Sequence, residues 1–547
     1  MSTTAEPAAA LTDPPPISRP MPPVLGRLLR GTFWLALRTP LQAVFALWSV
    51  PLLLQAVGKD QAGAYYFAWS FGFLQFLLEF GMSSALQRRV SETWTRGDRG
   101  AVQRAVAAGL TFYAAMAAAQ VVVLMAIAYL ALPHMGYSGA SKTLIVRLLW
   151  LQAVTAPFYG LSTVVSSVLQ AARRYDFIPK YEMAIVLARF AILVGGLHAG
   201  FGLFAIVVAQ TAAAIGLSLI PAVWVMVRDL GFVPRLGGAR RADFASLMHI
   251  SFFMFLMQLS VVLATSIDTS VLGFALPRPG AATAEYNVVS KPFTQVRQTG
   301  WMLAYLVMPA VASLVAAQDW KGLERVKYDG PRLHIGLLLP VALLAWIYAA
   351  PFLQLWVGRA FPPSKIPALA GLLQLFLVAA LPLVLTIYAQ MAIGMGKIEV
   401  IAISSLAGAL VNLPISYYLT LRTGTCAGVI WGTVLTTLIA NGIVPGVYLF
   451  RVLEVRASAF LSRTLGAPMA GGLALVAASW ALRMAWSAEP AGSTLASRSM
   501  PLMAHLAVGC LAYLAGYLAV PAGRSDAKVL LAKVRRRPFP TAVEGLH

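Results

Sequence analysis

The chain has 547 residues, of which 59% are hydrophobic and only 11% charged, and its mean hydropathy is +0.75. Soluble domains carry about 25% charged residues, so this chain has too few polar residues to cover a water-exposed surface. The net charge of +22 would suggest nucleic acid as a partner in a soluble protein, but no basic region is long enough to form a domain. Composition therefore excludes a soluble enzyme and a nucleic-acid-binding protein.

About fourteen apolar runs are long enough to cross a bilayer core, which needs roughly 20 residues per helix. The first run follows a Pro- and Ala-rich segment and is too long for a signal-peptide core. The expected fold is an all-α polytopic membrane protein. In chain order the predicted helices span 31–57, 65–86, 105–132, 146–171, 181–199, 202–227, 247–276, 286–315, 333–357, 366–393, 398–420, 426–450, 466–486 and 502–521.

The basic residues orient these helices. With the N-terminus in the cytoplasm, the cytoplasmic segments carry 29 Lys and Arg, the outer segments carry nine, and four fall inside helices. Because Lys and Arg concentrate in cytoplasmic loops, both termini are predicted to be cytoplasmic. No predicted loop exceeds about 20 residues, which leaves no room for an extramembrane catalytic domain.

Two segments 220 residues apart predict an internal repeat. Residues 62–75 and 282–295 share six of fourteen positions without a gap. An even number of crossings separates them, which fits two parallel six-helix halves with a substrate site between them. The predicted organisation is a cytoplasmic segment 1–30, an N-lobe 31–227, a cytoplasmic linker 228–246, a C-lobe 247–450, two extra helices in 451–521 and a basic cytoplasmic tail 522–547.

Charged residues inside predicted helices are candidates for a functional site, because a charge in the bilayer is costly unless it faces a partner or water. Arg38 and Glu79 lie at similar depth in adjacent helices, so they form either a structural ion pair or part of a site. Arg189 is a further cation at mid-depth, for which pairing with Glu182 is the structural alternative. The two cysteines, Cys426 and Cys510, have no zinc-site or disulfide spacing, and no metal site is predicted.

The second half carries a more polar set. Asp268 is bracketed in depth by Lys291 and Arg297 of the next helix. That helix has one polar face, which lines a water-filled cavity or forms a hydrogen-bonded helix seam. Because cations outnumber carboxylates at depth, a cavity here would favour an anionic headgroup. The residues of the face are Asn287, Lys291, Thr294, Gln295 and Gln298.

Short motifs occur at corresponding places in the two halves. Helix 1 ends and helix 2 begins as Gly58-Lys-Asp-Gln-Ala-Gly-Ala-Tyr-Tyr66, and the second half has Asp268-Thr-Ser-Val-Leu-Gly273 followed by Ala284-Glu-Tyr-Asn-Val-Val-Ser-Lys291. Over residues 30–460 the chain resembles the polysaccharide (O-antigen type) flippases of the multidrug/oligosaccharidyl-lipid/polysaccharide (MOP) exporter superfamily. Ala64 and Ala284 depart from the aromatic residue and the glycine usual in these motifs.

The resemblance implies a flippase of the bacterial inner membrane, and not an enzyme. It would move undecaprenyl-diphosphate-linked oligosaccharide by alternating access, for surface polysaccharide such as lipopolysaccharide O-antigen or exopolysaccharide, beside the glycosyltransferases and polymerase of the same pathway. No cofactor is expected beyond a coupling ion, H⁺ or Na⁺. Asp268 and Glu79 are the candidates for coupling or counter-charge. The candidates for contact with substrate are Arg38, Arg189, Asn287, Lys291, Gln295, Arg297 and Gln298.

Three other functions stay open at this point. A lipid II flippase and a cation-coupled multidrug exporter belong to the same superfamily. The exporter would concentrate carboxylates, rather than arginines, in its cavity. A membrane glycosyltransferase is disfavoured by the short loops.

Overall fold

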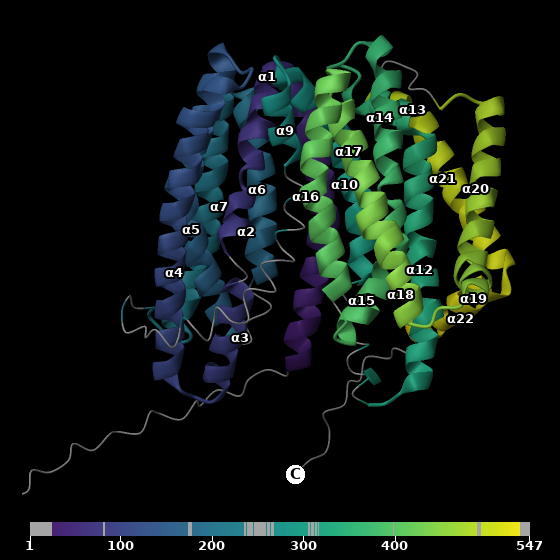
Figure 1. The fold of residues 1–547 in the computed structure, drawn as a ribbon, viewed down its shortest axis with the longest axis horizontal. Coiled ribbons are helices and arrows are strands. Elements are labelled where there is room, and N and C mark those ends of the chain that lie inside the picture. Colours follow the sequence, from purple (N-terminus) through teal and green to yellow (C-terminus); the bar gives the residue numbers. More distant parts are fainter. Residues whose placement is uncertain are drawn as a thin grey trace, which may run out of the picture.

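The computed structural model describes residues 24–79, 82–172, 178–234, 267–304, 317–397, 399–488 and 494–535, together with a few single positions between these ranges. Every regular element in the described ranges is a helix, which confirms the all-α prediction. Figure 1 shows long helices running roughly parallel, with the first half of the chain on one side and the second half on the other.

Eleven described segments are long and apolar enough to span a membrane. The first, Pro40–Gln75, includes most of the predicted helix 31–57 and the first half of the predicted helix 65–86, with a kink between them where Gly58 has a φ of 75°. Glycine adopts this left-handed conformation without steric cost. The helix predicted at 286–315 begins earlier, at Pro279, and its polar face lowers its hydropathy. The helix predicted at 247–276 lies mostly outside the described residues.

The N-lobe helices follow the predicted order, with one predicted helix divided. The predicted helix 65–86 corresponds to parts of three helices, because α1 ends at Ser70, α2 runs from Phe73 to Leu78 and α3 begins at Met82. A one-turn π segment and a 3₁₀ turn extend α4 to His134. The elements are α1 (Val24–Ser70), α2 (Phe73–Leu78), α3 (Met82–Thr95), α4 (Arg99–Ala126), α5 (Gly139–Ala171), α6 (Ile178–His198) and α7 (Leu203–Arg228).

In the C-lobe, the helix predicted at 333–357 begins thirteen residues earlier, at Trp320. The Asp319 side chain caps it by accepting a hydrogen bond of 2.8 Å from the Gly322 amide. The basic stretch expected in a loop is therefore helical. The elements are α9 (Asp268–Ala275), α10 (Pro279–Ala304), α12 (Trp320–Ile347), α13 (Ala349–Val357), α14 (Ile366–Val378), α15 (Thr386–Gly394), α16 (Glu399–Thr423), α17 (Ala427–Thr437) and α18 (Val444–Val452).

Five further elements follow the C-lobe. A short helix and a π-helical segment lead into the first of two long helices, and a last helix follows the second. They are α19 (Ala457–Ala459), η6 (Phe460–Leu465), α20 (Gly466–Ala485), α21 (Leu495–Ala519) and α22 (Pro521–Arg535). The pair α20 and α21 packs beside α12, at the edge of the C-lobe in Figure 1.

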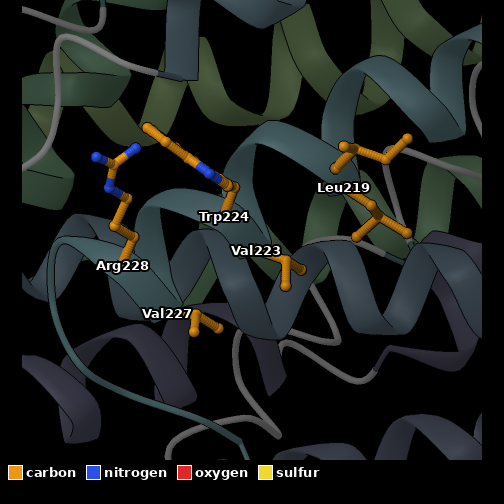
Figure 2. A pocket seen from close by; sticks show the side chains of 6 residues that line it. Leu219, Val223, Trp224, Val227 and Arg228 are labelled. Carbon is orange, nitrogen blue, oxygen red and sulfur yellow. The ribbon is translucent and has the colours of Figure 1, made fainter.

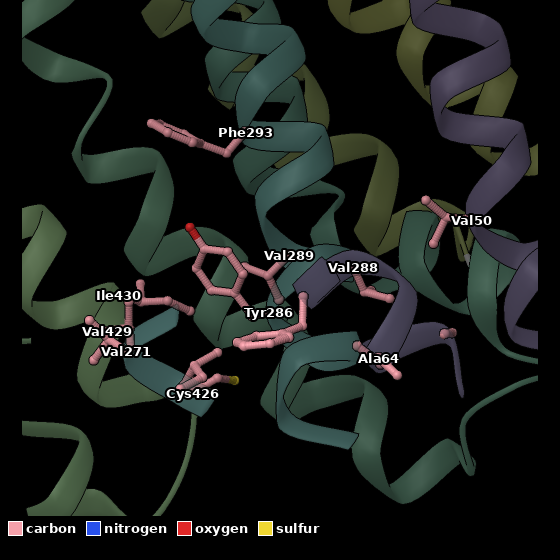
Figure 3. Packing of buried hydrophobic residues seen from close by; sticks show 14 of the residues in the cluster. Val50, Ala64, Val271, Tyr286, Val288, Val289, Phe293, Cys426, Val429 and Ile430 are labelled. Atoms are coloured by element: carbon pink, nitrogen blue, oxygen red, sulfur yellow. The ribbon is translucent and has the colours of Figure 1, made fainter. Parts of the chain in front are cut away.

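At one end of the molecule the two lobes share a hydrophobic core, part of which Figure 3 shows around Tyr286. The indole nitrogen of Trp356 donates a hydrogen bond of 2.8 Å to the carbonyl of Leu47, and the hydroxyls of Tyr137 and Thr283 are 3.3 Å apart. At the opposite end each lobe has a core of its own, around Leu86 in the N-lobe and around Tyr388 in the C-lobe. Among the described residues, the lobes thus share a core at one end, here called the closed end, and have separate cores at the other, here called the open end.

The closed end also supports the predicted repeat. A Cβ on Gly63 would overlap the backbone of Gly280, and a Cβ on Gly280 would lie 3.1 Å from the Cα of Asp60. Asp60 and Gly280 are 220 positions apart, which is the repeat offset. A two-fold axis brings equivalent positions into contact. Superposition of 62–75 on 282–295 stays a prediction.

Candidate functional site

The polar face of α10 changes in exposure along its length. Near the closed end, Asn287 is 7% exposed, and its amide donates a hydrogen bond of 2.9 Å to the Thr283 carbonyl. Lys291 and Gln295 are half-buried, and Gln298 is exposed. The face therefore emerges from the shared core and becomes accessible towards the end where the lobe cores are separate. Asn287 belongs to the buried part and not to the accessible part.

Three predicted cations lie on helices that contact α1. Lys291 and Arg297 of α10 are half-buried, and Arg189 of α6 is exposed. The part of the chain that the structure describes contains no carboxylate within ion-pair distance of any of them. Arg189 interacts electrostatically with Tyr65 of α1. The three cations are thus at least partly exposed and have no ion-pair partner among the described acids, although Arg297 interacts electrostatically with Asp268.

Glu79 is buried at the break between α2 and α3, where its carboxylate accepts a hydrogen bond of 2.8 Å from the Tyr113 hydroxyl. The side chain of Arg38 lies outside the described residues. The Arg38–Glu79 ion pair therefore stays a prediction.

Asp268 begins α9 and is 2% exposed. Its Oδ2 accepts hydrogen bonds from the Tyr286 hydroxyl at 2.7 Å and the Thr433 hydroxyl at 3.1 Å. Its Oδ1 has no hydrogen-bond partner among the described residues. Lys291 and Arg297, predicted to bracket it in depth, form no ion pair with it in the described part of the chain. Its hydrogen-bond partners are hydroxyls from α10 and α17, while Arg297 interacts with it electrostatically.

A polar chain continues from Asp268 into α16 and α17. The Asn412 amide donates to the Thr433 hydroxyl at 3.4 Å. The Ser416 hydroxyl donates to Asn412 Oδ1 at 2.8 Å and lies 3.5 Å from the Val429 carbonyl. We call Asp268, Tyr286, Asn412, Ser416 and Thr433 the Asp268 cluster.

Sequence reasoning missed Asn412, Ser416 and Thr433, because uncharged polar residues in apolar runs carry little signal. The available signal was spacing: Asn412, Ser416 and Thr420 recur every four residues and share one helix face.

The Asp268 cluster offers only oxygen ligands and one amide, which suits a hard cation or a proton. The ligand types include a carboxylate, hydroxyls and, close by, a backbone carbonyl. No group of three or more His, Cys, Asp or Glu occurs among the described residues, so they contain no cluster typical of a transition metal.

Two hollows lie away from these polar residues. Figure 2 shows the larger, a groove of about 490 Å³ on α7 lined by Leu219, Val223 and Trp224, with the Arg228 guanidinium 4.8 Å from the Trp224 ring centre. The other, of about 360 Å³, is lined by Arg147, Trp150 and neighbouring apolar side chains. Both are apolar with one arginine at the margin, as expected where a helix faces lipid.

Known structures with a similar fold are membrane transporters. A lipid II flippase, MurJ, in an inward closed conformation matches with a TM-score of 0.65 at 12% identity, over 94% of this chain and 100% of that one. An inward-facing multidrug resistance MATE family transporter of the MOP superfamily matches with a TM-score of 0.59 at 15% identity, over 76% and 96%. At this identity the likeness concerns the fold. The comparison with curated proteins gave no match.

The family model for "Polysaccharide biosynthesis protein" matches residues 28–315, more than half of the chain. This match covers the N-lobe and the helices that carry Asp268 and Lys291. Together with the fold, it confirms the resemblance found in the short motifs. The chain belongs to the polysaccharide biosynthesis protein family and is a multi-pass membrane protein with the fold of the MOP transporters.

Proposed function

We propose that this protein is a flippase that moves undecaprenyl-diphosphate-linked oligosaccharide across the bacterial inner membrane for surface polysaccharide biosynthesis. It acts by transport and not by catalysis. The family match and the fold of lipid II and MATE transporters support this class of activity.

The observation that carries the proposal is the set of cations Lys291, Arg297 and Arg189, which are at least partly exposed and form no ion pair with an acid among the described residues. A cation within a membrane-spanning helix is costly and is retained where it serves a polar partner. A diphosphate provides that partner through charge-assisted hydrogen bonds, and arginine can bind it with two parallel bonds. A cationic drug would be repelled by the same set.

The charge distribution supports a cytoplasmic position for the open end. The closed end includes Lys59 and Asp60 in a segment predicted to be outside, whereas α3 and the start of α12 carry the basic residues of segments predicted to be cytoplasmic. In that orientation both termini are cytoplasmic. The accessible part of the α10 face then opens to the side on which the lipid-linked substrate is made.

The Asp268 cluster is our candidate for the coupling-ion site. Its Oδ1 without a partner, beside hydroxyl and amide groups from three other helices, supports binding of Na⁺ or of a proton. Neutralisation of the carboxylate would change the packing of α9, α10, α16 and α17 against one another, and would thereby couple the ion gradient to lobe movement.

A lipid II flippase is the second candidate. The match to MurJ extends over 94% of this chain and includes the C-terminal helices, and lipid II carries the same diphosphate. The two functions differ in the headgroup carried on the diphosphate.

Gene deletion followed by complementation tests the proposal. Surface polysaccharide should disappear on deletion while lipid II turnover and drug sensitivity stay normal. Wild-type protein should restore it. A Lys291→Ala/Arg297→Ala variant should not, at equal membrane abundance on immunoblots.

Arg325→Ala is the matched control, because Arg325 is exposed at the start of α12. It should restore export fully. Normal export by the double variant would refute the diphosphate site. Loss of lipid II turnover, with polysaccharide precursors unaffected, would favour the second candidate.

A further inference from the structure

The last helix, α22, is fastened to the C-lobe by a buried ion pair. Arg332 of α12 donates from Nε to Asp526 Oδ2 at 2.8 Å and from Nη2 to Oδ1 at 2.6 Å. The two residues are 6% and 8% exposed. Two parallel bonds fix both the distance and the orientation of the carboxylate.

Neighbouring groups complete the attachment. The Tyr517 hydroxyl of α21 donates to Asp526 Oδ2 at 2.7 Å, and Arg332 Nη1 donates to the Arg463 carbonyl of η6 at 3.0 Å. The Tyr517 ring lies against Gly336 of α12, where a Cβ would be 3.0 Å away. One face of α22 is therefore held against α12 and α21, and α22 also contacts α20.

The other face of α22 is basic. Arg524 and Lys528 are both exposed, and each lies two positions from Asp526 along the helix, so they project away from the buried face. They are four residues apart and therefore adjacent on the surface. The sequence continues with Lys533, Arg535, Arg536 and Arg537, and the next acid after Asp526 is Glu544. Because Asp526 is paired with Arg332 on the buried face, the charged residues on the exposed face of the described part of α22, Arg524 and Lys528, are both positive.

The chain also sets the depth of α22. The spanning segment Ser497–Ala519 ends α21, and only Val520 separates it from Pro521, the first residue of α22. A helix that begins one residue after a spanning helix starts at the membrane surface. Figure 1 shows α22 beside α19, at the end of α20.

We propose that α22 binds the acidic phospholipid head groups of the adjacent leaflet through Arg524 and Lys528, while Asp526 holds its other face on the C-lobe. Charge complementarity supports this partner, since Lys and Arg at a membrane surface are attracted to anionic lipids. A surface helix held rigidly on a lobe gives that lobe a fixed contact with the leaflet. This role is separate from cargo binding and does not depend on the proposed function.

Hydrogen exchange of the full-length protein in nanodiscs tests the proposal. The lipids are phosphatidylcholine alone or phosphatidylcholine mixed with phosphatidylglycerol. Amides of 521–535 should exchange more slowly when phosphatidylglycerol is present. In Arg524→Gln/Lys528→Gln the protection should fall by roughly fivefold per charge removed.

The matched control is Lys321→Gln/Arg325→Gln. These two exposed basic residues are also four apart, but lie at the start of α12. This variant should keep the response of the wild type. Equal exchange in both lipids, or an undiminished response in the Arg524→Gln/Lys528→Gln variant, would overturn the proposal and would point to a cytoplasmic protein as the partner of this face.

Discussion

Two buried carboxylates of the second half have opposite environments. Asp526 is held by the guanidinium of Arg332, with both carboxylate oxygens bonded. Asp268 receives two hydroxyl donors on one oxygen and has no described partner on the other. Removing one partner from a neutralised buried pair leaves an uncompensated charge, whereas a carboxylate that has no ion-pair partner and is surrounded by hydroxyl and amide groups can take up a cation. The arrangement around Asp526 attaches α22 to the C-lobe, whereas the arrangement around Asp268 suits the binding and release of a coupling ion.

The largest effect should come from breaking the attachment. Asp526→Ala removes the buried carboxylate partner of Arg332, leaves it only the half-exposed Asp329, and should lower the free energy of unfolding by about 3–5 kcal/mol. Thermal unfolding in detergent measures this. Asp329→Ala is the control, because Asp329 also pairs with Arg332 at 3.0 Å, but its side chain is 52% exposed. Its loss should cost under about 1 kcal/mol. Equal effects of the two variants would contradict the proposed attachment.

A smaller decrease in the free energy of unfolding is expected from a substitution at Tyr286. Tyr286→Phe keeps the ring in the shared core but removes the 2.7 Å donor to Asp268. Leaving a buried polar group without its hydrogen-bond partner lowers the free energy of unfolding by about 1–3 kcal/mol. Unfolding measurements at two Na⁺ concentrations would sharpen the comparison, since an ion that binds the cluster should offset part of the loss. An identical loss at both concentrations would argue against Na⁺ at this place.

The substitution Glu79→Gln tests whether Glu79 resembles Asp526, in a buried ion pair, or Asp268, held by hydroxyl donors. If Glu79 is held by Tyr113 alone, the amide retains an acceptor and the free energy of unfolding should fall by about 1 kcal/mol. A loss of 3–5 kcal/mol would instead reveal a buried ion pair, such as the predicted one with Arg38. We expect the smaller value.

Asp268→Asn should have the smallest effect on stability and the largest effect on the coupling of transport to the ion gradient. Asp268→Asn keeps the shape of the side chain and an oxygen that accepts hydrogen bonds from Tyr286 and Thr433. The free energy of unfolding should therefore change by less than about 1 kcal/mol. Transport in proteoliposomes should nevertheless lose its dependence on pH or Na⁺. Retained ion dependence in a well-folded variant would remove Asp268 from the coupling mechanism.

The helices and the polar face of α10 could be predicted because both depend on local patterns: length of apolar runs and spacing of polar residues. The start of α12 at Trp320 could not be read from hydropathy, because a helix that leaves the membrane becomes polar without ending. The helix ends at Ser70 and Leu78 do have a local signal, because Gly72 and Gly81 follow them, but hydropathy alone does not show it.

Long-range partners were the least predictable feature. Arg332 and Asp526 are 194 residues apart, and neither was singled out, because Arg332 was counted among the loop cations and Asp526 among the residues of the tail. Likewise, Asp268 was expected near cations, while its partner Thr433 is 165 residues away and uncharged. Such contacts depend on how the lobes and helices pack against one another, and the spacing of residues along one helix gives no information about that packing.

The contact between Gly63 and Gly280 has a mechanical consequence. At this point the two lobes meet backbone to backbone, because neither residue has a side chain. Interlocked side chains would have to withdraw from one another before the lobes could turn, as closely packed surfaces resist sliding. Two backbone segments without side chains can turn against each other without such a withdrawal. We therefore expect this contact to act as the pivot when one lobe rotates on the other in the proposed transport cycle.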